Sequence, residues 1–298
     1  MLKKILAGII TLWIVLTLTF FILRWIPGGP FDAEKALPPE IKENIEALYG
    51  LNLPVHIQYI NYLKSLFKGD LGPSLKFRDL KVNDIISQAF PVSAKIGMIA
   101  FFLSLFLGIV LGLIEGMGKS ISKSISSLFS VLISFPSFGW ASILLFLLSY
   151  KIGIFPPALL ENFSHYFLPV LTLSIIPTAH IGMLVGARTR EEMGKGYFTF
   201  HRSLGFSEKK IYGKFLLKNV LSPVISSIGP MFAYLITGSF IVEKIFAIPG
   251  LGKFFVTSVI DRDYTTVVGL TVLFCAILIA VNIITEWLLR AIDPREKK

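Results

Sequence analysis

The sequence contains a single cysteine and few charged residues, which make up 16% of its 298 positions. Cys275 lies in an apolar run and has no second cysteine for an internal disulfide, so we interpret it as a small residue that faces lipid or the core. The chain also lacks a zinc-ligand spacing, a GxSxG motif and a pair of carboxylates on one face of an apolar segment. These absences leave no support for an enzyme.

A segment that imitates a phosphate-binding loop is excluded as well. GMGKS at 116–120 resembles the end of a P-loop, but the motif needs four residues between its first glycine and the glycine-lysine pair, and Leu113 stands at that place. The motif also needs a preceding strand, whereas an apolar run typical of a membrane helix precedes this segment. We therefore expect no nucleotide binding by this chain.

What the chain has in abundance is apolar side chains. Hydrophobic residues make up 54% of it and the mean hydropathy is +0.72, whereas soluble domains contain about 45–50% apolar residues even on a count that includes glycine. The sequence therefore predicts an integral membrane protein. Its 29 Lys and Arg residues outnumber 19 Asp and Glu residues, but they cluster beside apolar segments, where orientation in the membrane explains them, so we expect lipid and no nucleic acid as a partner.

Six apolar segments are long enough to cross roughly 30 Å of hydrocarbon. The first is interpreted as an uncleaved helix and not a signal peptide, because Arg24, Trp25 and Pro27 follow it in place of a small-residue cleavage site. Positive charge on alternate connections predicts both termini in the cytoplasm. Pro136 predicts a kink in the third segment, with a serine hydroxyl satisfying the freed carbonyl. The six segments are 5–23, 96–113, 126–148, 167–185, 224–241 and 266–289.

The domain organisation follows from these segments. We expect a first transmembrane helix at 1–26, an extracytoplasmic helical subdomain at 27–95, and a five-helix core at 96–298. The PGGP sequence at 27–30 forces a non-helical exit from the membrane. Helical periodicity at 39–51 and 55–67, ended by glycines, predicts short amphipathic helices that pack on the membrane domain, because so small a subdomain cannot bury a large core of its own.

A basic loop at 188–223 interrupts the apolar segments and is predicted to be cytoplasmic. Gly205 is expected to end one helical piece, and Ser207 with Glu208 to cap and charge the next. A solvated loop is the alternative, but the length and the helical pieces favour a docking surface for a cytoplasmic partner. Its positive residues are Arg188, Arg190, Lys195, Arg202, Lys209, Lys210, Lys214 and Lys218, against Glu191, Glu192 and Glu208.

Polar residues near the later apolar segments are candidates for a solute pathway. The small and hydroxyl residues of the fifth segment permit either close helix packing or a polar path, and both interpretations stay open. His180 is interpreted as hydrogen-bonded between helices and not as a metal ligand. A tight turn at 248–250, completed by Gly252, and a short amphipathic helix at 254–260 are compatible with an outer gate. The outer-gate or pore candidates are Glu243, Phe246, Pro249, Gly250, Ser226 and Thr237.

The arrangement resembles the inner-membrane permease subunits of dipeptide, oligopeptide and nickel ABC importers, and the resemblance covers nearly the whole chain. It implies a type I ABC importer permease fold, all-α, in the cytoplasmic membrane of a prokaryote, with this chain as half of the pore. A second permease, two ATPase subunits that hold ATP and Mg, and an extracytoplasmic solute-binding protein are the implied partners. The resemblance is carried by PGGP, residues 48–75, SFPSF, VEKIFAIPGLG at 242–252, Arg262-Asp263-Tyr264, Asn282 and Asp293-Pro294-Arg295.

The loop around Gly205 resembles the coupling helix of this family, which seats in a groove of the ATPase. The coupling residues that follow are Arg190, Tyr197, Arg202, Gly205, Ser207 and Glu208, and Met193, Asn219 and Pro223 also match the family pattern. Phe200 and His201 depart from it, because relatives usually carry smaller side chains there.

The resemblance favours a non-catalytic permease for short peptides that works by alternating access. Nickel, an oligosaccharide or another small solute is the alternative within the family. A secondary carrier or channel is the alternative from another class, but an ion-coupled carrier is expected to bury carboxylates in its spans, and these spans contain almost none. The energy for transport is therefore expected to come from a partner.

Overall fold

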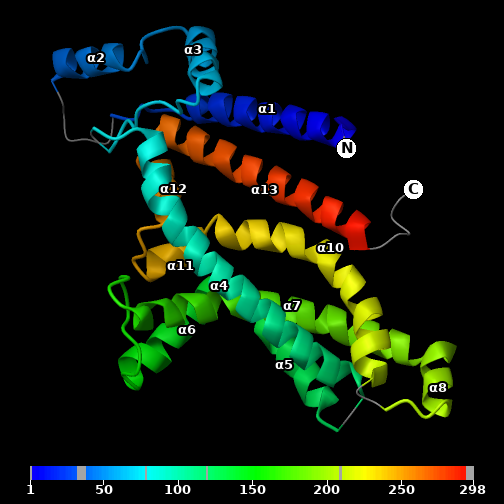
Figure 1. Ribbon diagram of the computed structural model, residues 1–298. Helices are drawn as coiled ribbons and strands as arrows, with labels where there is room; N and C mark the ends of the chain where they lie inside the picture. The colour runs from blue at the N-terminus through cyan, green and yellow to red at the C-terminus, as the bar shows by residue number, and fades with distance from the viewer. Residues whose placement is uncertain (1, 32–37, 78, 119, 208–209, 293–298) are drawn as a thin grey trace. The chain divides into compact units, whose positions relative to one another are not determined.

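The computed structural model describes residues 2–31, 38–77, 79–118, 120–207 and 210–292, and the regular structure within them is helical (Figure 1). Five of the described helices are long and apolar enough to cross a membrane, and a bent pair of helices brings the number to six when the pair is counted as one span. All six predicted apolar segments fall in these helices, which confirms the all-α membrane fold. The spans are α1 (Leu2–Trp25), α4 (Val82–Gly116), the pair α5 (Ser122–Ser134) and α6 (Ser137–Leu144), α7 (Phe167–Met193), α10 (Leu217–Ile236) with α11 (Phe240–Ile245), and α13 (Tyr264–Ile292).

The third span is broken and not merely kinked, so this prediction was wrong in degree. The pair is bent by 101° between Ser134 and Ser137. Phe135 and Pro136 are both extended, because a residue before proline is driven out of the helical region. The carbonyl of Leu132, which the proline ring leaves without its helical donor, accepts a hydrogen bond of 2.9 Å from the indole N–H of Trp140. The indole of Trp140 therefore supplies the hydrogen bond that we expected from a serine hydroxyl.

The chain divides into two compact units, Met1–Ser93 with Pro249–Ile279 and Ala94–Ile248 with Ala280–Lys298. The first unit contains α1, α2 (Pro39–Leu48), α3 (Val55–Phe67), the start of α4, α12 (Leu251–Ile260) and the first part of α13. The two short helices predicted in the external segment are therefore present. As expected for a segment without a large core, α3 packs on the membrane helices. Its contact residues Tyr59, Tyr62, Leu63 and Leu66 surround a cluster of Leu16, Phe20, Val268 and Val272.

A buried carboxylate at the start of α13 holds the loop at 74–75 in place. Asp263 accepts hydrogen bonds from the backbone N–H of Leu75 at 3.1 Å, from the hydroxyl of Ser74, and from the N–H and hydroxyl of Thr266 at 3.1 and 2.7 Å. The last two bonds cap the first turn of α13, because the N–H groups there have no partner within the helix. One side chain thus begins a membrane helix and fixes the loop at 74–75.

The two residues beside Asp263 hold the exit from α1. Arg262 has a left-handed backbone with φ +57° and donates a hydrogen bond of 2.8 Å to the carbonyl of Pro27. The hydroxyl of Tyr264 donates one of 2.8 Å to the carbonyl of Gly28. Gly28 has φ +99°, and a Cβ there would overlap the guanidinium of Arg262. The Arg-Asp-Tyr sequence therefore ties residues 27–28 and 74–75 to the start of α13.

We predict that Asp263→Asn lowers the free energy of unfolding by about 1–3 kcal/mol, because an amide turns an NH₂ group toward buried donors that need an acceptor. Thermal unfolding of the purified assembly in nanodiscs measures this change. Asp261→Asn is the matched control, because Asp261 is half-exposed, and it is expected to leave the midpoint unchanged. Equal midpoints for both variants would contradict the structural role of Asp263.

The second unit is built around α7, its most buried span. α5, α6, α10 and α11 pack against it. The unit also contains the end of α4, the π-helix η1 (Leu145–Lys151), the 3₁₀-helix η2 (Phe163–Tyr166), α8 (Gly196–Ser203), the π-helix η3 (Ile211–Leu216) and the end of α13.

Glycines allow α4 to approach the backbone of α7. Gly108, Gly112 and Gly116 recur every four residues, so they lie on one face of α4. A Cβ at Gly112 would stand 2.5 Å from the carbonyl oxygen of Gly182 and 2.7 Å from Cβ of Val185, and the other two positions are equally crowded by α7. Close packing of small residues is a main source of helix association in lipid, where no hydrophobic effect operates between helices.

Gly112→Ala is therefore predicted to destabilise the second unit by about 1–3 kcal/mol, because the added methyl group meets backbone that has no room to yield. The control is Gly139→Ala in α6, where the new Cβ would lie at an ordinary 3.7 Å from its nearest neighbour. The prediction is checked by measuring the denaturation midpoints of the two variants in the same detergent. A midpoint for Gly112→Ala at or above that of the wild type would rule out close packing at this position.

The segment after α10 differs in detail from its prediction. α10 ends at Ile236, and Gly238 with φ +91° separates it from α11, which contains Glu243 and ends at Ile245. Gly252 was expected to complete the turn at 248–250, but it lies in the first turn of α12. Ala247 instead takes the left-handed conformation, with φ +50°. Gly250 is the extended residue immediately before α12.

Candidate functional site

The basic loop consists of helical pieces separated at a glycine, as predicted. α7 ends at Met193, α8 follows, and Gly205 then adopts φ +74°, a conformation that strongly favours glycine. The carbonyl of Ser207 accepts hydrogen bonds from the N–H groups of Lys210 and Ile211, so the next helical piece begins there. Glu208 lies outside the residues that the structure describes.

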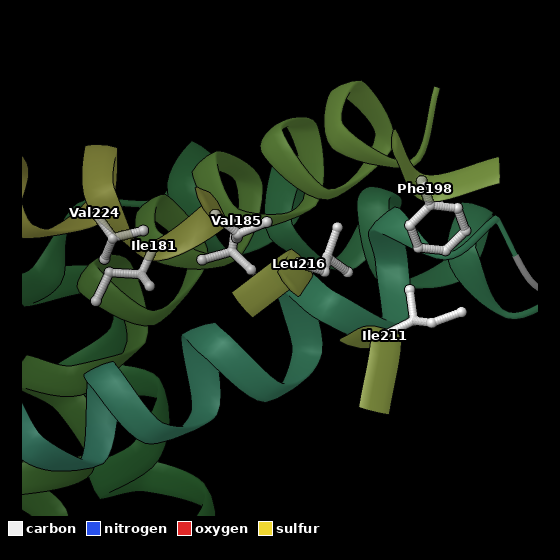
Figure 2. Close-up of a cluster of buried hydrophobic side chains, with 7 residues drawn as sticks. Ile181, Val185, Phe198, Ile211, Leu216 and Val224 are labelled. Atoms are coloured by element: carbon white, nitrogen blue, oxygen red, sulfur yellow. The ribbon is translucent and has the colours of Figure 1, made fainter. Parts of the chain in front are cut away.

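α8 is attached to the membrane helices by a hydrophobic cluster, here called the α8 cluster (Figure 2). Figure 2 shows its labelled side chains in a row, with Phe198 and Ile211 at one end and Ile181 and Val224 at the other. α7, α8, η3 and α10 all contribute to it, and α8 packs against α7 and against η3, which continues directly into α10. The buried members are Ile181, Val185, Phe198, Ile211, Leu216, Val220 and Val224.

Glu192, near the end of α7, joins the loop to α10 by polar contacts. It is buried, forms an ion pair with Lys195, and accepts hydrogen bonds from the hydroxyl of Tyr197 at 2.6 Å and from the amide of Asn219 at 3.2 Å. Burial, and then the bond to Glu192, raises the pKa of Tyr197, so its phenol stays a donor. From the sequence, Glu192 is recognised only as one of the charges of the loop. Its spacing from Lys195 is the one local sign of these contacts, because Asn219 is distant in sequence.

Arg190, also predicted to act in coupling, points to a different helix. Its guanidinium forms an ion pair with Glu115 at the end of α4. The carboxylate of Glu115 is buried, and a Cβ at Gly186 would overlap its other oxygen. The pair therefore fixes α4 to α7 at the same end of the helices as α8. Sequence analysis did not single out Glu115.

The outward surface of the loop carries the remaining predicted residues. Arg202, Gly205 and Ser207 are exposed. Two exposed apolar side chains lie beside them in the sequence, Phe200 and Leu204, and Phe200 is 60% exposed. An apolar tip with a flanking arginine is typical of a surface that is covered by a partner protein.

His201, the other residue that departs from the family pattern, serves the loop itself. Its Nδ1 lies 2.6 Å from the carbonyl oxygen of Tyr197. Its ring packs on Phe215 at a centroid distance of 4.0 Å and on Phe206 at 5.7 Å. His201 therefore stabilises the turn after α8, and Phe200 alone of the two presents a large side chain to a partner.

A cavity of about 620 Å³ lies between α7, α10 and the start of α6. Residues four apart on α7, from Thr172 through Ile176 and His180 to Leu184, form one wall because they share a helix face. The lining is mostly apolar. Its polar side chains are Ser137, Thr172, His180, Ser227 and Tyr234.

The cavity revises the expectation for His180. His180 makes no hydrogen bond among the described residues and faces the cavity instead of bonding between helices. Thr172 also lines the cavity, and its hydroxyl is buried without a hydrogen-bond partner in the part of the chain that the structure describes. No group of three or more His, Cys, Asp or Glu that could hold a metal occurs among the described residues.

The predicted pore and gate residues are distributed over several places. Ser226 lies on α10, Thr237 is the residue directly after the end of that helix, and Ser227 is the neighbouring hydroxyl that lines the cavity. Glu243 and Phe246 are buried in the second unit, where the carbonyl of Phe246 accepts a hydrogen bond from the N–H of Leu159. In the first unit, Pro249 is exposed and Gly250 is buried.

The Glu192 contacts lead to a prediction. Glu192→Gln removes the charge that three donors share, so amide hydrogen exchange in residues 196–203 and 211–216 is expected to accelerate about tenfold, equivalent to about 1.4 kcal/mol. Glu191→Gln is the control, because Glu191 makes only exposed ion pairs with Arg188 and Lys195, which contribute little. Unchanged exchange in the Glu192 variant would show that the polar contacts do not hold the loop.

Comparison with known proteins gives consistent matches over both parts of the chain. Residues 104–298 match the family described as binding-protein-dependent transport system inner membrane component, and residues 1–93 match its N-terminal family. The oligopeptide transport system permease protein OppB of Haemophilus influenzae is 38% identical, with 98% of this chain and 97% of the relative covered. The dipeptide transport system permease protein DppB of Bacillus subtilis is 37% identical, with 100% and 97% covered.

Solved structures show the same fold at lower identity. The MetNI methionine ABC transporter, in inward-facing conformations, matches with a TM-score of 0.54 and 16% identity over 70% of this chain and 98% of that one. An amino acid ABC transporter crystallised with histidines matches with a TM-score of 0.53 and 17% identity over 72% and 94%.

Proposed function

Because the chain belongs to the family of binding-protein-dependent transport system inner membrane components, we propose that it forms half of the pore of an ATP-driven importer of short peptides. A second permease subunit supplies the other half. Two ATPase subunits, which hold ATP and Mg, bind at the α8 end, and an extracytoplasmic solute-binding protein delivers the peptide. Both termini and the loop at 188–223 are cytoplasmic, and ATP hydrolysis belongs to the partners and not to this chain.

Two residues shared between the α8 cluster and the cavity carry this proposal. Ile181 of α7 and Val224 of α10 belong to the buried cluster that holds α8, and both also line the cavity. A displacement of α8 by an ATPase is therefore passed through packed side chains to the helices that form the cavity wall. Packed interiors transmit such displacements because they have little free volume to absorb them.

The cavity suits part of a peptide. Its volume is in the range of about 300–1,000 Å³ that is usual for small-molecule sites, which combine an apolar lining with a few polar groups. Hydroxyls and an imidazole can bond to peptide N–H and carbonyl groups, while the apolar wall accepts varied side chains. The names of the relatives favour peptides over the family alternatives, which are nickel, oligosaccharides and other small solutes.

The proposal predicts that Gly205→Pro abolishes peptide-stimulated ATP hydrolysis in the reconstituted complex, lowering it to the unstimulated rate. Proline fixes φ near −65°, whereas this position requires φ +74°, so the exposed tip of the loop is displaced. Gly205→Asn is the matched control, since asparagine tolerates a positive φ, and it should keep most of the stimulation.

Complex assembly is checked in the same preparations by size-exclusion chromatography. An assembled Gly205→Pro complex that peptides still stimulate as strongly as the wild type would refute coupling through this loop. Stimulation of the wild type by nickel and its binding protein, and not by peptides, would replace the peptide assignment with the metal alternative.

A further inference from the structure

α3 presents three different faces around its axis. At about 100° per residue, Tyr59, Tyr62, Leu63 and Leu66 form the face that packs on α1 and α13. Polar residues lie to one side of this face. On its other side lies an exposed stripe, here called the α3 stripe, made of Ile57, Ile60, Lys64 and Phe67. Ile60 is 48% exposed and Phe67 is 90% exposed.

On the polar side of α3, Gln58 is hydrogen-bonded to neighbouring parts of the chain. The amide of Gln58 donates to the carbonyl oxygens of Leu51 and Leu53 at 3.0 and 2.8 Å, and its own oxygen accepts a bond of 3.0 Å from Arg24. The α3 stripe has no such cover among the described residues. The helix thus bonds the amide of Gln58 within the protein and leaves apolar side chains exposed, which is the reverse of the arrangement expected in water.

The depth of α3 beside α1 accounts for this reversal. The hydroxyls of Tyr59 and Thr17 are 2.6 Å apart, and the Tyr59 ring lies 5.4 Å from that of Phe21, an exposed residue on α1. Thr17 precedes Trp25 by eight residues, or about 12 Å along the helix axis. Side chains of α3 therefore reach α1 inside its apolar span, and Figure 1 shows α3 crossing this end of α1 and not running along it.

We propose that α3 lies in the lipid leaflet at the Trp25 end of α1, with the α3 stripe in contact with acyl chains. The stripe adjoins the lipid-facing side of α1 through Phe21 and Tyr59, and Trp25, 89% exposed, marks the level of the headgroups. Lys64 and Lys68 extend to lipid phosphates, as lysines beside an apolar face do at membrane surfaces. A protein partner fits less well, because the cores of protein interfaces are depleted in lysine.

The test places a fluorophore on the α3 stripe of the assembled complex in liposomes. Single cysteines replace Ile60 and Phe67 in a Cys275→Ser background and are labelled with an environment-sensitive dye. Ile9→Cys on the exposed face of α1 is the lipid reference, and Glu43→Cys on α2 is the water reference. Both stripe positions are exposed, so these substitutions leave the core intact.

Doxyl-labelled lipid is expected to quench both stripe positions to within a factor of about two of Ile9, and iodide is expected to quench them far less than Glu43. Strong iodide quenching at the stripe, as at Glu43, would overturn the proposal. Protection from both quenchers would also overturn it, because it would show that a protein, either the second permease or the solute-binding protein, covers the stripe.

Discussion

The packing of α8 against α7 and against η3, which continues into α10, is the constraint on which the proposed coupling depends. A short helix of eight residues has little stability of its own, so its position is fixed by the α8 cluster and by the contacts of Glu192. Those contacts connect it to the two helices that wall the cavity. The loop surface and the cavity are therefore parts of one packed body, and neither can move far without the other.

The remaining structure supplies rigid surroundings for that body. Glycines on α4 bring its backbone against α7, and the ion pair of Glu115 and Arg190 fixes the same two helices at their ends. In the first unit, Asp263 joins the start of α13 to the loop at 74–75 by hydrogen bonds. The hydrophobic effect is weak between helices in lipid, so close packing and buried polar bonds hold these parts of the chain together instead.

Much of this fold follows from the sequence because its signals are local. Apolar length fixes the six spans, periodicity gives α3 its bounds, and Gly205 marks the break that its positive φ requires. The site is less predictable, because its contacts join residues distant in the chain. Glu192 meets Asn219, and whether His180 faces a neighbour or a cavity depends on how the helices are rotated.

The central claim is tested most directly by the number of peptides imported per ATP hydrolysed in the Leu216→Ala complex. Leu216 is buried in the α8 cluster, and its truncation loosens packing by about 2–5 kcal/mol without altering the exposed surface of α8. ATP hydrolysis is expected to continue while this ratio falls, whereas Leu168→Ala, an equal truncation outside the cluster, is expected to preserve it. An unchanged ratio in the Leu216 variant would contradict transmission through the cluster.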